Sequence, residues 1–382
     1  MSMEESDARA ALRVSPLRPF LLERYFARFE FTTRFLLASS DCEALTLAEL
    51  LELGDDRDRA AWDGLKLAYT ESPGLLELRE QIAAGYPGLA ADDVVTAVPE
   101  EAIYILGRAV LRRGDRVIVT FPGYQSLYEI AGSVGAQVER WTPEETPDGW
   151  WFDPRRLEAL AKDGAKAIVV NFPHNPTGAL PSPAEWAEVV ATAERIGALL
   201  VSDEMYRGLE YDEDQRLTPA AVASERGVSI AGLSKAYGLP GLRVGWLATR
   251  DRELLEAVQA YKDYTTICAS APSERLAVVA LKNAPRLVGR CRAIVAANRP
   301  LLEACLSRQA DRFAWRPPLA GPIAFARFHP GDATAFCERL ALAAGVMLLP
   351  SSVFEWGDTH VRFGFGRTSF AGALAVLERH LG

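Results

Sequence analysis

The chain has 382 residues, of which 49% are hydrophobic and 24% charged, which is enough for two domains or one large one. Its formal net charge of −9 argues against a nucleic-acid or acidic-membrane partner, and no uncharged apolar run approaches the length of a membrane span. Residues 1–9 lack the apolar core of a signal peptide, the five cysteines have no CxxC spacing, and the four histidines lack metal-ligand spacing. We therefore expect a cytoplasmic protein with reduced cysteines and no metal site.

The N-terminal segment is rich in phenylalanine, leucine and arginine between about residues 10 and 38. From Pro19 onward the apolar residues recur at helical spacing, so the sequence predicts an extended arm that leads into an amphipathic helix. Ser39, Ser40 and Asp41 follow, and short polar residues of this kind suit a helix cap or an Asx-turn.

An anion site is predicted where a short strand turns into a helix. Residues 92–98 have the pattern of a strand, and Pro99 suits the first turn of the helix that follows. Free N–H groups and the helix dipole favour negative charge at such an N-terminus. Because proline has no N–H, Glu100, Glu101 and Ala102 are left to supply the donors.

Buried strands then alternate with helices, which predicts a parallel sheet. The apolar runs 165–171 and 198–203 end in Asn171 and Asp203, and a helix is expected between them at 185–196. Sheets of this kind bind ligands at the ends of their strands, so we expect these polar side chains to lie at a site.

The C-terminal third has a different pattern. Helical spacing predicts helices at 251–264 and 273–306, with a break in the second at Pro285. Short apolar runs near Phe313, Ile323 and His360 predict strands with helices between them. No internal repeat is present in the sequence.

Residues 232–245 carry one lysine, Lys235, among glycine and serine, with Arg243 eight positions later. In a mostly apolar pocket an amine loses some of its charge and can attack a carbonyl carbon. The planar fork of an arginine suits a phosphate. Together these groups are what a pyridoxal phosphate (PLP) Schiff base requires, although a glycine-rich surface loop with two solvated cations is the alternative interpretation.

The stretch resembles the lysine signature of the class I and II aminotransferases, the fold-type-I PLP enzymes. It matches each defined position of that signature: Gly232, Ser234, Lys235, Gly238, Leu239, Gly241, Arg243, Val244 and Gly245. Other family motifs follow in family order between about residues 69 and 367. They include Tyr-x-x-x-x-Gly-x-x-x-Leu-Arg from Tyr69, Asn-Pro-x-Gly from Asn175 and Asp-x-x-Tyr from Asp203.

The resemblance implies an α/β fold, the PLP-dependent transferase fold type I. We expect a large PLP-binding domain at residues 46–270, in which helices flank a mostly parallel seven-stranded sheet. A smaller α+β C-terminal domain would occupy residues 271–382. Residues 1–45 would form an N-terminal arm and a small-domain segment, and the likeness also implies a homodimer with shared active sites.

The family implies a role for each matching residue around the cofactor. Lys235 would hold PLP as a Schiff base and act as general base, and Asp203 would pair with the pyridine nitrogen. Tyr206 and Asn175 would bond the ring hydroxyl, and Tyr124 would stack on the ring. The other expected cofactor contacts are Tyr69, which would reach across the dimer, Glu100, Glu101, Ser234 and Arg243. Many relatives have a phosphate-bonding serine in place of Gly232, so together with Pro99 we expect modest cofactor affinity.

The family also implies where the substrate binds. Arg362 would grip the α-carboxylate in a bidentate fork, with Arg367 as a less favoured substitute. Asn171 and Ser40 would adjoin the substrate. Ordinary structural roles are the alternatives: a surface cation for Arg362, a core tyrosine for Tyr69, and a helix cap or salt bridge for Asp203.

We expect an aminotransferase that moves the amino group of an α-amino acid to a 2-oxo acid. The same apparatus supports β-elimination or cyclisation, and stretches at 23–26, 124–127, 170–178 and 234–246 are similar to capreomycidine-synthase-like members of the family. A PLP-binding regulator without catalysis is a further class, which the intact set of family residues disfavours. The side chain of the substrate stays open, although Asp41 and Glu43 would suit a basic one.

Overall fold

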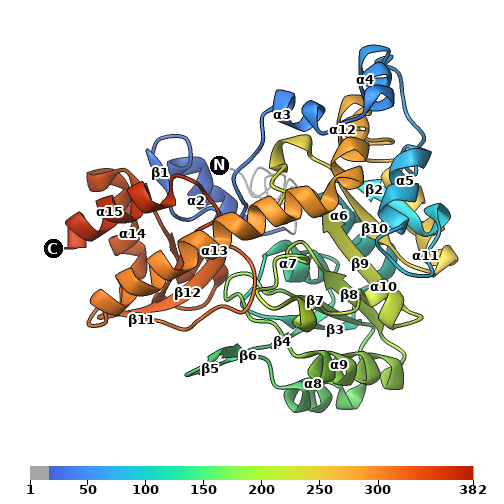
Figure 1. Ribbon diagram of the computed structural model, residues 1–382. Coiled ribbons are helices and arrows are strands. Elements are labelled where there is room, and N and C mark those ends of the chain that lie inside the picture. Colours follow the sequence, from blue (N-terminus) through green and yellow to red (C-terminus); the bar gives the residue numbers. More distant parts are fainter. Residues whose placement is uncertain (1–16, 382) are drawn as a thin grey trace, which may run out of the picture.

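A seven-stranded sheet forms the centre of the computed structural model, which describes residues 17–381 (Figure 1). In spatial order its strands are β2 (Val94–Ala97), β10 (Gly245–Ala248), β9 (Gly227–Gly232), β8 (Leu199–Asp203), β7 (Ala167–Asn171), β3 (Arg116–Thr120) and β4 (Gln137–Trp141). β10 pairs antiparallel with both of its neighbours, β2 and β9, and the other four pairs of this sheet are parallel. The predicted mostly parallel seven-stranded sheet is therefore confirmed.

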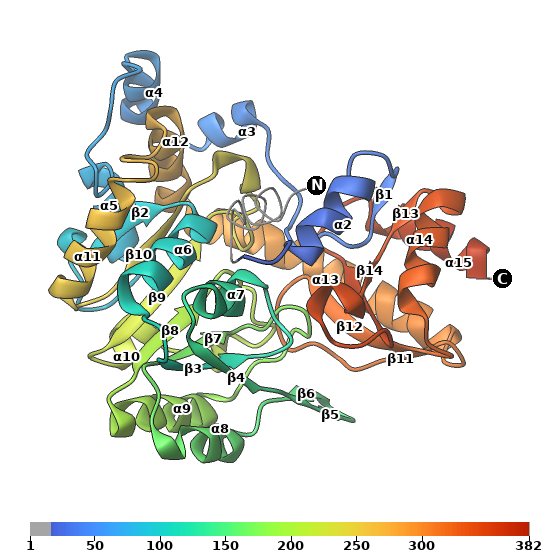
Figure 2. The same cartoon turned by 180° about the vertical axis from the view of Figure 1, so that it is seen from behind.

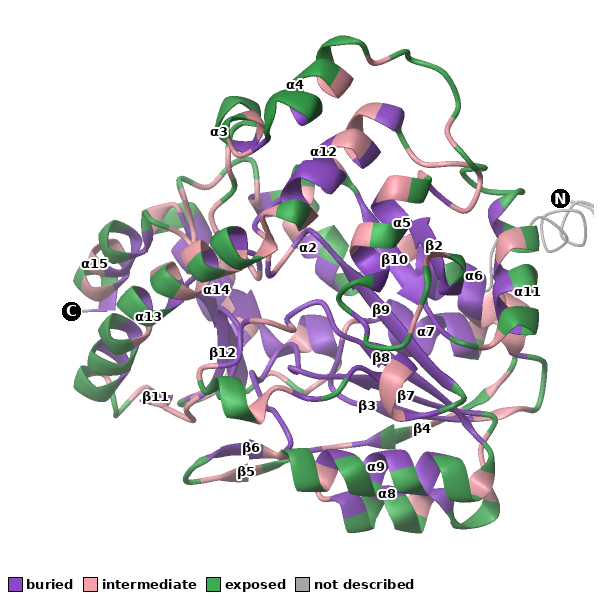
Figure 3. Ribbon diagram, turned by 45° about the vertical axis from the view of Figure 1, so that its right-hand side comes forward, coloured by how far each residue is buried: buried purple, intermediate pink, exposed green. Residues whose placement is uncertain are grey.

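Helices cover both faces of this sheet, so the central strands are buried along their whole length (Figure 3). Such strands have near-continuous apolar runs, because neither face meets water. One face packs against α6 (Pro99–Val110), α7 (Ser126–Ser133) and α11 (Arg252–Lys262). The other packs against α8 (Pro154–Leu160), α9 (Pro183–Ile196), α10 (Ala220–Ala223), α5 (Leu76–Ala83) and α12 (Ala271–Lys282).

Helix α9 shows how the local sequence sets the ends of an element. At its start Ser182 and Glu185 form a reciprocal capping box, and Pro183 occupies the first turn. At its end Gly197 adopts φ 66°, a left-handed conformation that glycine adopts without strain. The helix predicted at 185–196 is thereby confirmed, starting two residues earlier.

The C-terminal part is a smaller α+β domain built on a four-stranded antiparallel sheet. Its strands are β11 (Phe313–Ala314), β12 (Ile323–Phe328), β15 (His360–Gly364) and β14 (Leu349–Pro350), and α14 (Ala333–Ala344) and α15 (Phe370–Leu381) pack beside them. The N-terminal segment joins this part, since β1 (Phe35–Leu36) pairs with β13 (Val346–Met347) beside α2 (Leu21–Phe29) (Figure 2).

The long helix α13 (Ala284–Arg308) links the two parts of the molecule (Figure 1). The predicted break lies at Asn283, between α12 and α13, because Pro285 takes the first turn of α13. Pro300 lies inside α13 without ending it. Helix α12 packs against α3 (Leu47–Glu52), α4 (Asp56–Asp63) and α5, while the predicted domain boundary at residue 271 stays a prediction.

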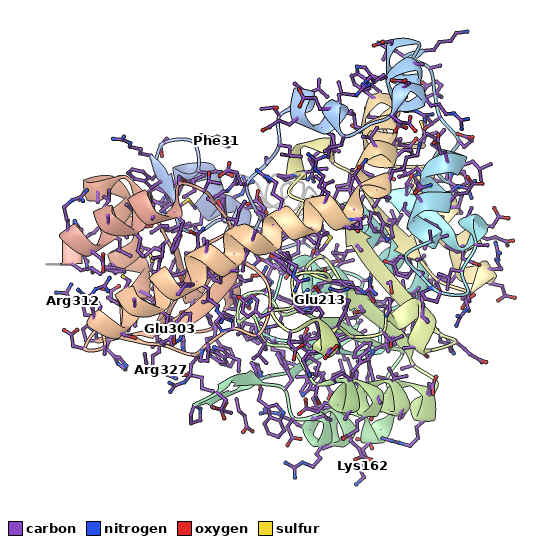
Figure 4. All side chains as sticks on the ribbon, in the orientation of Figure 1. Phe31, Lys162, Glu213, Glu303, Arg312 and Arg327 are labelled. Carbon is purple, nitrogen blue, oxygen red and sulfur yellow. The ribbon has the colours of Figure 1, made fainter. Side chains whose placement is uncertain are left out.

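A hairpin of β5 (Glu144–Thr146) and β6 (Gly149–Trp151) reaches from the large sheet to the small domain. Its Glu145 accepts from His360 Nε2 at 3.1 Å and forms an ion pair with Arg327, which Figure 4 labels. Within residues 17–381, no helix combines the length and the apolar character that crossing a bilayer requires.

Candidate active site

One cavity of about 400 Å³ lies where the ends of β7, β8 and β9 meet α2, the start of α6 and β15. It brings together residues that are far apart in the sequence. The expected site residues that line it are Ser40, Glu100, Tyr124, Asn171, Asn175, Asp203, Tyr206, Ser234, Lys235, Arg243 and Arg362. Parallel sheets bind ligands at this edge, where the strands end.

Lys235 follows β9 and faces the cavity. Its Nζ donates to the Ser40 hydroxyl oxygen at 2.9 Å. Burial lowers the pKa of the Lys235 ammonium, and the nearby Arg362 adds to this effect, whereas Asp41, Glu23 and Asp203 oppose it. The structure therefore contains an amine that loses its proton more readily than an exposed lysine.

Asp203 is the last residue of β8 and is 5% exposed. Its Oδ1 accepts one hydrogen bond, from the backbone N–H of Met205 at 3.1 Å. Burial raises the pKa of the carboxyl to about 7. A carboxylate in this place is stabilised by a cation that enters the cavity.

Asn171 holds the adjacent backbone in position. Its Nδ2 donates to the carbonyl oxygen of Asp203 at 3.0 Å, and its Oδ1 accepts from the N–H of Asn175 at 2.8 Å. Both ends of the amide have partners within the protein. Asn171 thus lines the cavity mainly as a support for its neighbours.

Arg362 lies on β15 and is 1% exposed, an unusual burial for a guanidinium. Nη1 donates to Asn175 Oδ1 at 2.8 Å, and Nη2 donates to the carbonyl oxygen of Ala38 at 2.7 Å. Nε is buried without a partner among the described residues, and burial lowers the pKa of the group to about 10. Because Asn175 uses its oxygen on Arg362, its NH2 group is left to donate.

Two tyrosines face the cavity in different ways. The Tyr206 hydroxyl is buried and has no hydrogen-bond partner among residues 17–381, and burial raises its pKa. The ring of Tyr124 packs on Phe20 with centroids 4.9 Å apart. Burial, and then the charges of Glu100 and Glu23, raise the pKa of the Tyr124 hydroxyl.

The start of α6 forms the predicted anion end of the cavity, with Pro99 in its first turn. The N–H groups of Glu100 and Glu101 belong to the first turn, where helix geometry provides no internal partner. Ala102, expected to be a third donor, instead donates to the carbonyl oxygen of Val98 at 2.9 Å. That part of the prediction is wrong, because the N–H closes the first turn of the helix.

Arg243 stands at the same end, exposed, with φ 53°. A left-handed conformation is uncommon for a residue with a side chain, and such strain clusters at functional sites. Its Nη1 donates to the carbonyl oxygen of Pro240 at 3.2 Å, which leaves other donors of the fork for a ligand.

Two expected site residues do not line the cavity. The carboxylate of Glu101 turns to a neighbouring pocket and accepts from the Thr266 hydroxyl at 2.8 Å. Tyr69 is 88% exposed and lies outside the cavity of its own subunit. Its expected reach across a dimer stays a prediction.

The hypothesis that Asp41 and Glu43 await a basic substrate group needs correction, because Arg367 already occupies them. Arg367 Nη2 donates to Asp41 Oδ2 at 2.9 Å, and Nη1 lies 3.9 Å from Glu43 Oε1. Because these contacts engage Arg367, it is less available to replace Arg362 as the residue that binds the substrate carboxylate. Glu43 also accepts from the backbone N–H of Thr368 at 2.9 Å.

Helix α2 and the residue after it also contribute to the cavity, although none of their residues was singled out from the sequence as a site residue. Leu22, Glu23, Phe26 and Glu30 all line it. The signal was present in the stretch 23–26, which is one of those similar to cyclising members of the family.

Two proteins of known function are similar to this chain over most of its length. The chain is 32% identical over 378 residues to the capreomycidine synthase of Streptomyces vinaceus, covering 97% of this chain and 95% of that protein. It is 30% identical to the aspartate aminotransferase of Thermococcus kodakarensis, covering 82% of this chain and 80% of that protein.

Two solved structures of PLP-dependent enzymes have the same fold as this chain. A PLP-dependent aminotransferase from Streptococcus suis has a TM-score of 0.88 at 28% identity, covering 96% of this chain and 98% of its own. The PLP-dependent cyclase OrfR has a TM-score of 0.89 at 31% identity, covering 97% and 98%. The model of the family aminotransferase class I and II matches residues 34–379. The chain therefore belongs to the class I and II aminotransferase family and is a PLP-dependent transferase.

Proposed function

We propose that the protein is an aminotransferase that moves the amino group of an α-amino acid to a 2-oxo acid. The observation that carries the proposal is the Lys235 amine, which faces the cavity with a pKa that burial lowers and with the Ser40 hydroxyl as its hydrogen-bond partner. A lysine of this kind is available to carry a carbonyl cofactor and to exchange protons with a bound substrate. Several relatives are described as aminotransferases, for aspartate, prephenate or N-succinyldiaminopimelate.

The residues of the cavity suit PLP. A protonated pyridine nitrogen would supply the cation that the buried carboxylate of Asp203 lacks. The ring hydroxyl would give the Tyr206 hydroxyl a partner, with the NH2 group of Asn175 beside it. Arg243 and the first turn of α6 would hold the phosphate.

When bound, the cofactor supplies a cationic ring that draws electrons from the substrate Cα, which makes the Cα–H bond acidic. Arg362 would bind the α-carboxylate with its free N–H groups and so orient that bond. Lys235 would remove the Cα proton as general base and deliver it to the cofactor carbon that is bonded to the substrate nitrogen. Asp203 would keep the ring nitrogen protonated throughout.

We expect the active unit to be a homodimer. Two segments expose large apolar side chains on one surface: Leu67 and Tyr69 are 86% and 88% exposed, and Tyr264 and Ile267 are 93% and 52% exposed. Ser72 holds the segments together, because its hydroxyl donates to the carbonyl oxygen of Ile267 at 2.7 Å. Apolar side chains gathered on a surface in this way mark an interaction site.

Elimination or cyclisation is the second candidate. It is favoured by the likeness to capreomycidine synthase over 97% of this chain and to the cyclase OrfR. The residues proposed above serve this chemistry equally, because the pathways differ only after the Cα proton has left. Tyr206 is a conventional aminotransferase feature and favours transamination.

The proposal is tested by following the amino nitrogen. PLP-loaded protein receives a ¹⁵N-labelled amino acid and an unlabelled 2-oxo acid, and mass spectrometry measures the label in each product. Transfer of ¹⁵N to the 2-oxo acid is expected, whereas its release as ammonium or retention in a cyclic product would support the second candidate. The Lys235→Ala variant should lose both turnover and the visible absorbance of the lysine-bound cofactor, and full activity of this variant would overturn both candidates.

A further inference from the structure

The cavity is rich in carboxylates on the side formed by α2. Glu23 lies on α2, Glu30 follows its last residue, and Asp41 lies in the loop after β1 and lines the same cavity. Glu23 and Glu30 are separated by about two helical turns, which places them on the same face of α2. Phe26 lies between them and also lines the cavity.

Among these groups, Glu23 and Glu30 have no cationic partner. Asp41 is paired with Arg367 at 2.9 Å, but neither glutamate forms an ion pair with any residue between 17 and 381. Burial raises the pKa of the Glu30 carboxyl and the charges of Asp41 and Glu23 raise it further, whereas the charges of Arg367 and Lys235 oppose this rise without offsetting it. Anionic groups held together in this way are stabilised by a cation that enters between them.

The three cations of the described chain that line the cavity already have proposed partners other than Glu23 and Glu30. In the function proposed above, Lys235 carries the cofactor, Arg243 holds its phosphate and Arg362 binds the substrate carboxylate. Buried atoms without partners in the same cavity, the Tyr206 hydroxyl and Arg362 Nε, independently indicate that a polar ligand binds here. Since no cation of residues 17–381 forms an ion pair with Glu23 or Glu30, a cationic group of the ligand would be their direct partner.

We propose that the cavity selects an α-amino acid whose side chain ends in a cation. The ammonium or guanidinium group binds Glu23 and Glu30, and the methylene chain packs on Phe26. This inference rests on the proposed function, because Arg362 fixes the end of the substrate that carries the carboxylate. It also moves the acidic determinant from Asp41 and Glu43, which Arg367 engages, to α2.

The test is a spectral titration of the PLP-loaded protein with two matched pairs of amino acids. Lysine is compared with uncharged norleucine, and arginine with uncharged citrulline, and the apparent Kd is taken from the change in the cofactor band. In at least one pair the cationic member should bind about tenfold tighter or more, since charge-assisted hydrogen bonds are the strong ones. The pair that shows the preference identifies an ammonium or a guanidinium ligand.

Variants locate the preference. In Glu23→Gln/Glu30→Gln the two members of a pair should bind within about twofold of each other. Glu338→Gln is the control, because it removes one acidic charge from a surface ion pair with Arg28 of α2, and neither of these residues lines the cavity. This control should keep the full preference. Equal preference in the double variant and the parent protein would overturn the assignment to α2.

The outcomes separate this inference from the proposed function. If uncharged or acidic amino acids change the cofactor band and cationic ones bind no better, the inference fails and the proposed function stands. If no amino acid changes the band, the proposed function fails as well.

Discussion

Gly232→Ser is a substitution for which family likeness and the structure predict opposite effects. Many relatives have a serine here that bonds the cofactor phosphate, and a hydrogen bond to a charged group contributes about 1.5–3 kcal/mol. Likeness alone would therefore predict tighter PLP binding by tenfold or more. In this structure a Cβ at Gly232 would lie 2.8 Å from Pro99 Cγ and 3.0 Å from both Gly245 Cα and the Val244 carbonyl oxygen.

These short separations determine how much the substitution should destabilise the protein. Carbon atoms in contact prefer about 3.5–4.0 Å, so either α6 or β10 has to move by several tenths of an ångström. Extra atoms forced into a packed region cost about 1–3 kcal/mol. Because Pro99 opens the helix that faces the phosphate, the shift should also disturb the anion site. We expect a lower Tm and no gain in PLP affinity.

The assay is a double-mutant cycle with Gly232→Ser, Pro99→Ala and the pair, measuring the Tm of the cofactor-free protein and the Kd of PLP by fluorescence. The proline ring accounts for the closest contact, so the pair should recover part of the loss, with a coupling energy of about 0.5–3 kcal/mol. A Gly232→Ser variant that keeps the parent Tm and binds PLP tenfold tighter would show that Pro99 and β10 accommodate the added side chain.

Three further predictions concern named side chains. Burial raises the pKa of Asp203 from 3.8 to about 7. The free energy of unfolding therefore falls as the pH rises through this window, because the buried carboxyl resists losing its proton. Asp203→Asn should therefore stabilise the cofactor-free protein by up to about 4 kcal/mol above pH 7 and by less near pH 5, and melting curves with equal gains at both would contradict this. Arg362→Lys should raise the KM for amino acids about 100-fold and leave the cofactor band intact, because lysine cannot form a planar fork; an unchanged KM would count against it. Burial alone would raise the pKa of Glu145, but hydrogen bonds from His360 and Arg327 outweigh it and lower the pKa to about 2. Glu145→Gln should thus lower the Tm at neutral pH, by an amount that shrinks as the pH falls toward 2; a Tm loss independent of pH would argue against the ion pair.

The sequence was sufficient to predict the sheet and most of the expected residues that line the cavity. Buried strands can be recognised as apolar runs in the sequence. Ligands bind at the ends of parallel strands, so Asn171 and Asp203, the last residues of two such runs, could be predicted to lie at a site. The lysine motif is a continuous stretch, so its residues could be recognised without the fold.

Contacts between distant parts of the chain could not be predicted. Arg367 neutralises Asp41 across 326 positions, and no local pattern signals such a pair. The packing of Pro99 against Gly232 likewise depends on how α6 lies on β9 and β10. The substrate side of the cavity is built by α2 from a segment whose amphipathic pattern indicates a helix but not what that helix covers.

Transamination requires an amino acid to deliver its nitrogen to the cofactor that Lys235 would hold. A half-reaction measures this step, in which PLP-loaded protein is mixed with an amino acid without any 2-oxo acid. We expect one equivalent of 2-oxo acid per site, conversion of the cofactor to its amine form, and then no further change. Continued turnover that regenerates the PLP form, with ammonia or a cyclic product accumulating, would contradict transamination and identify a lyase or cyclase.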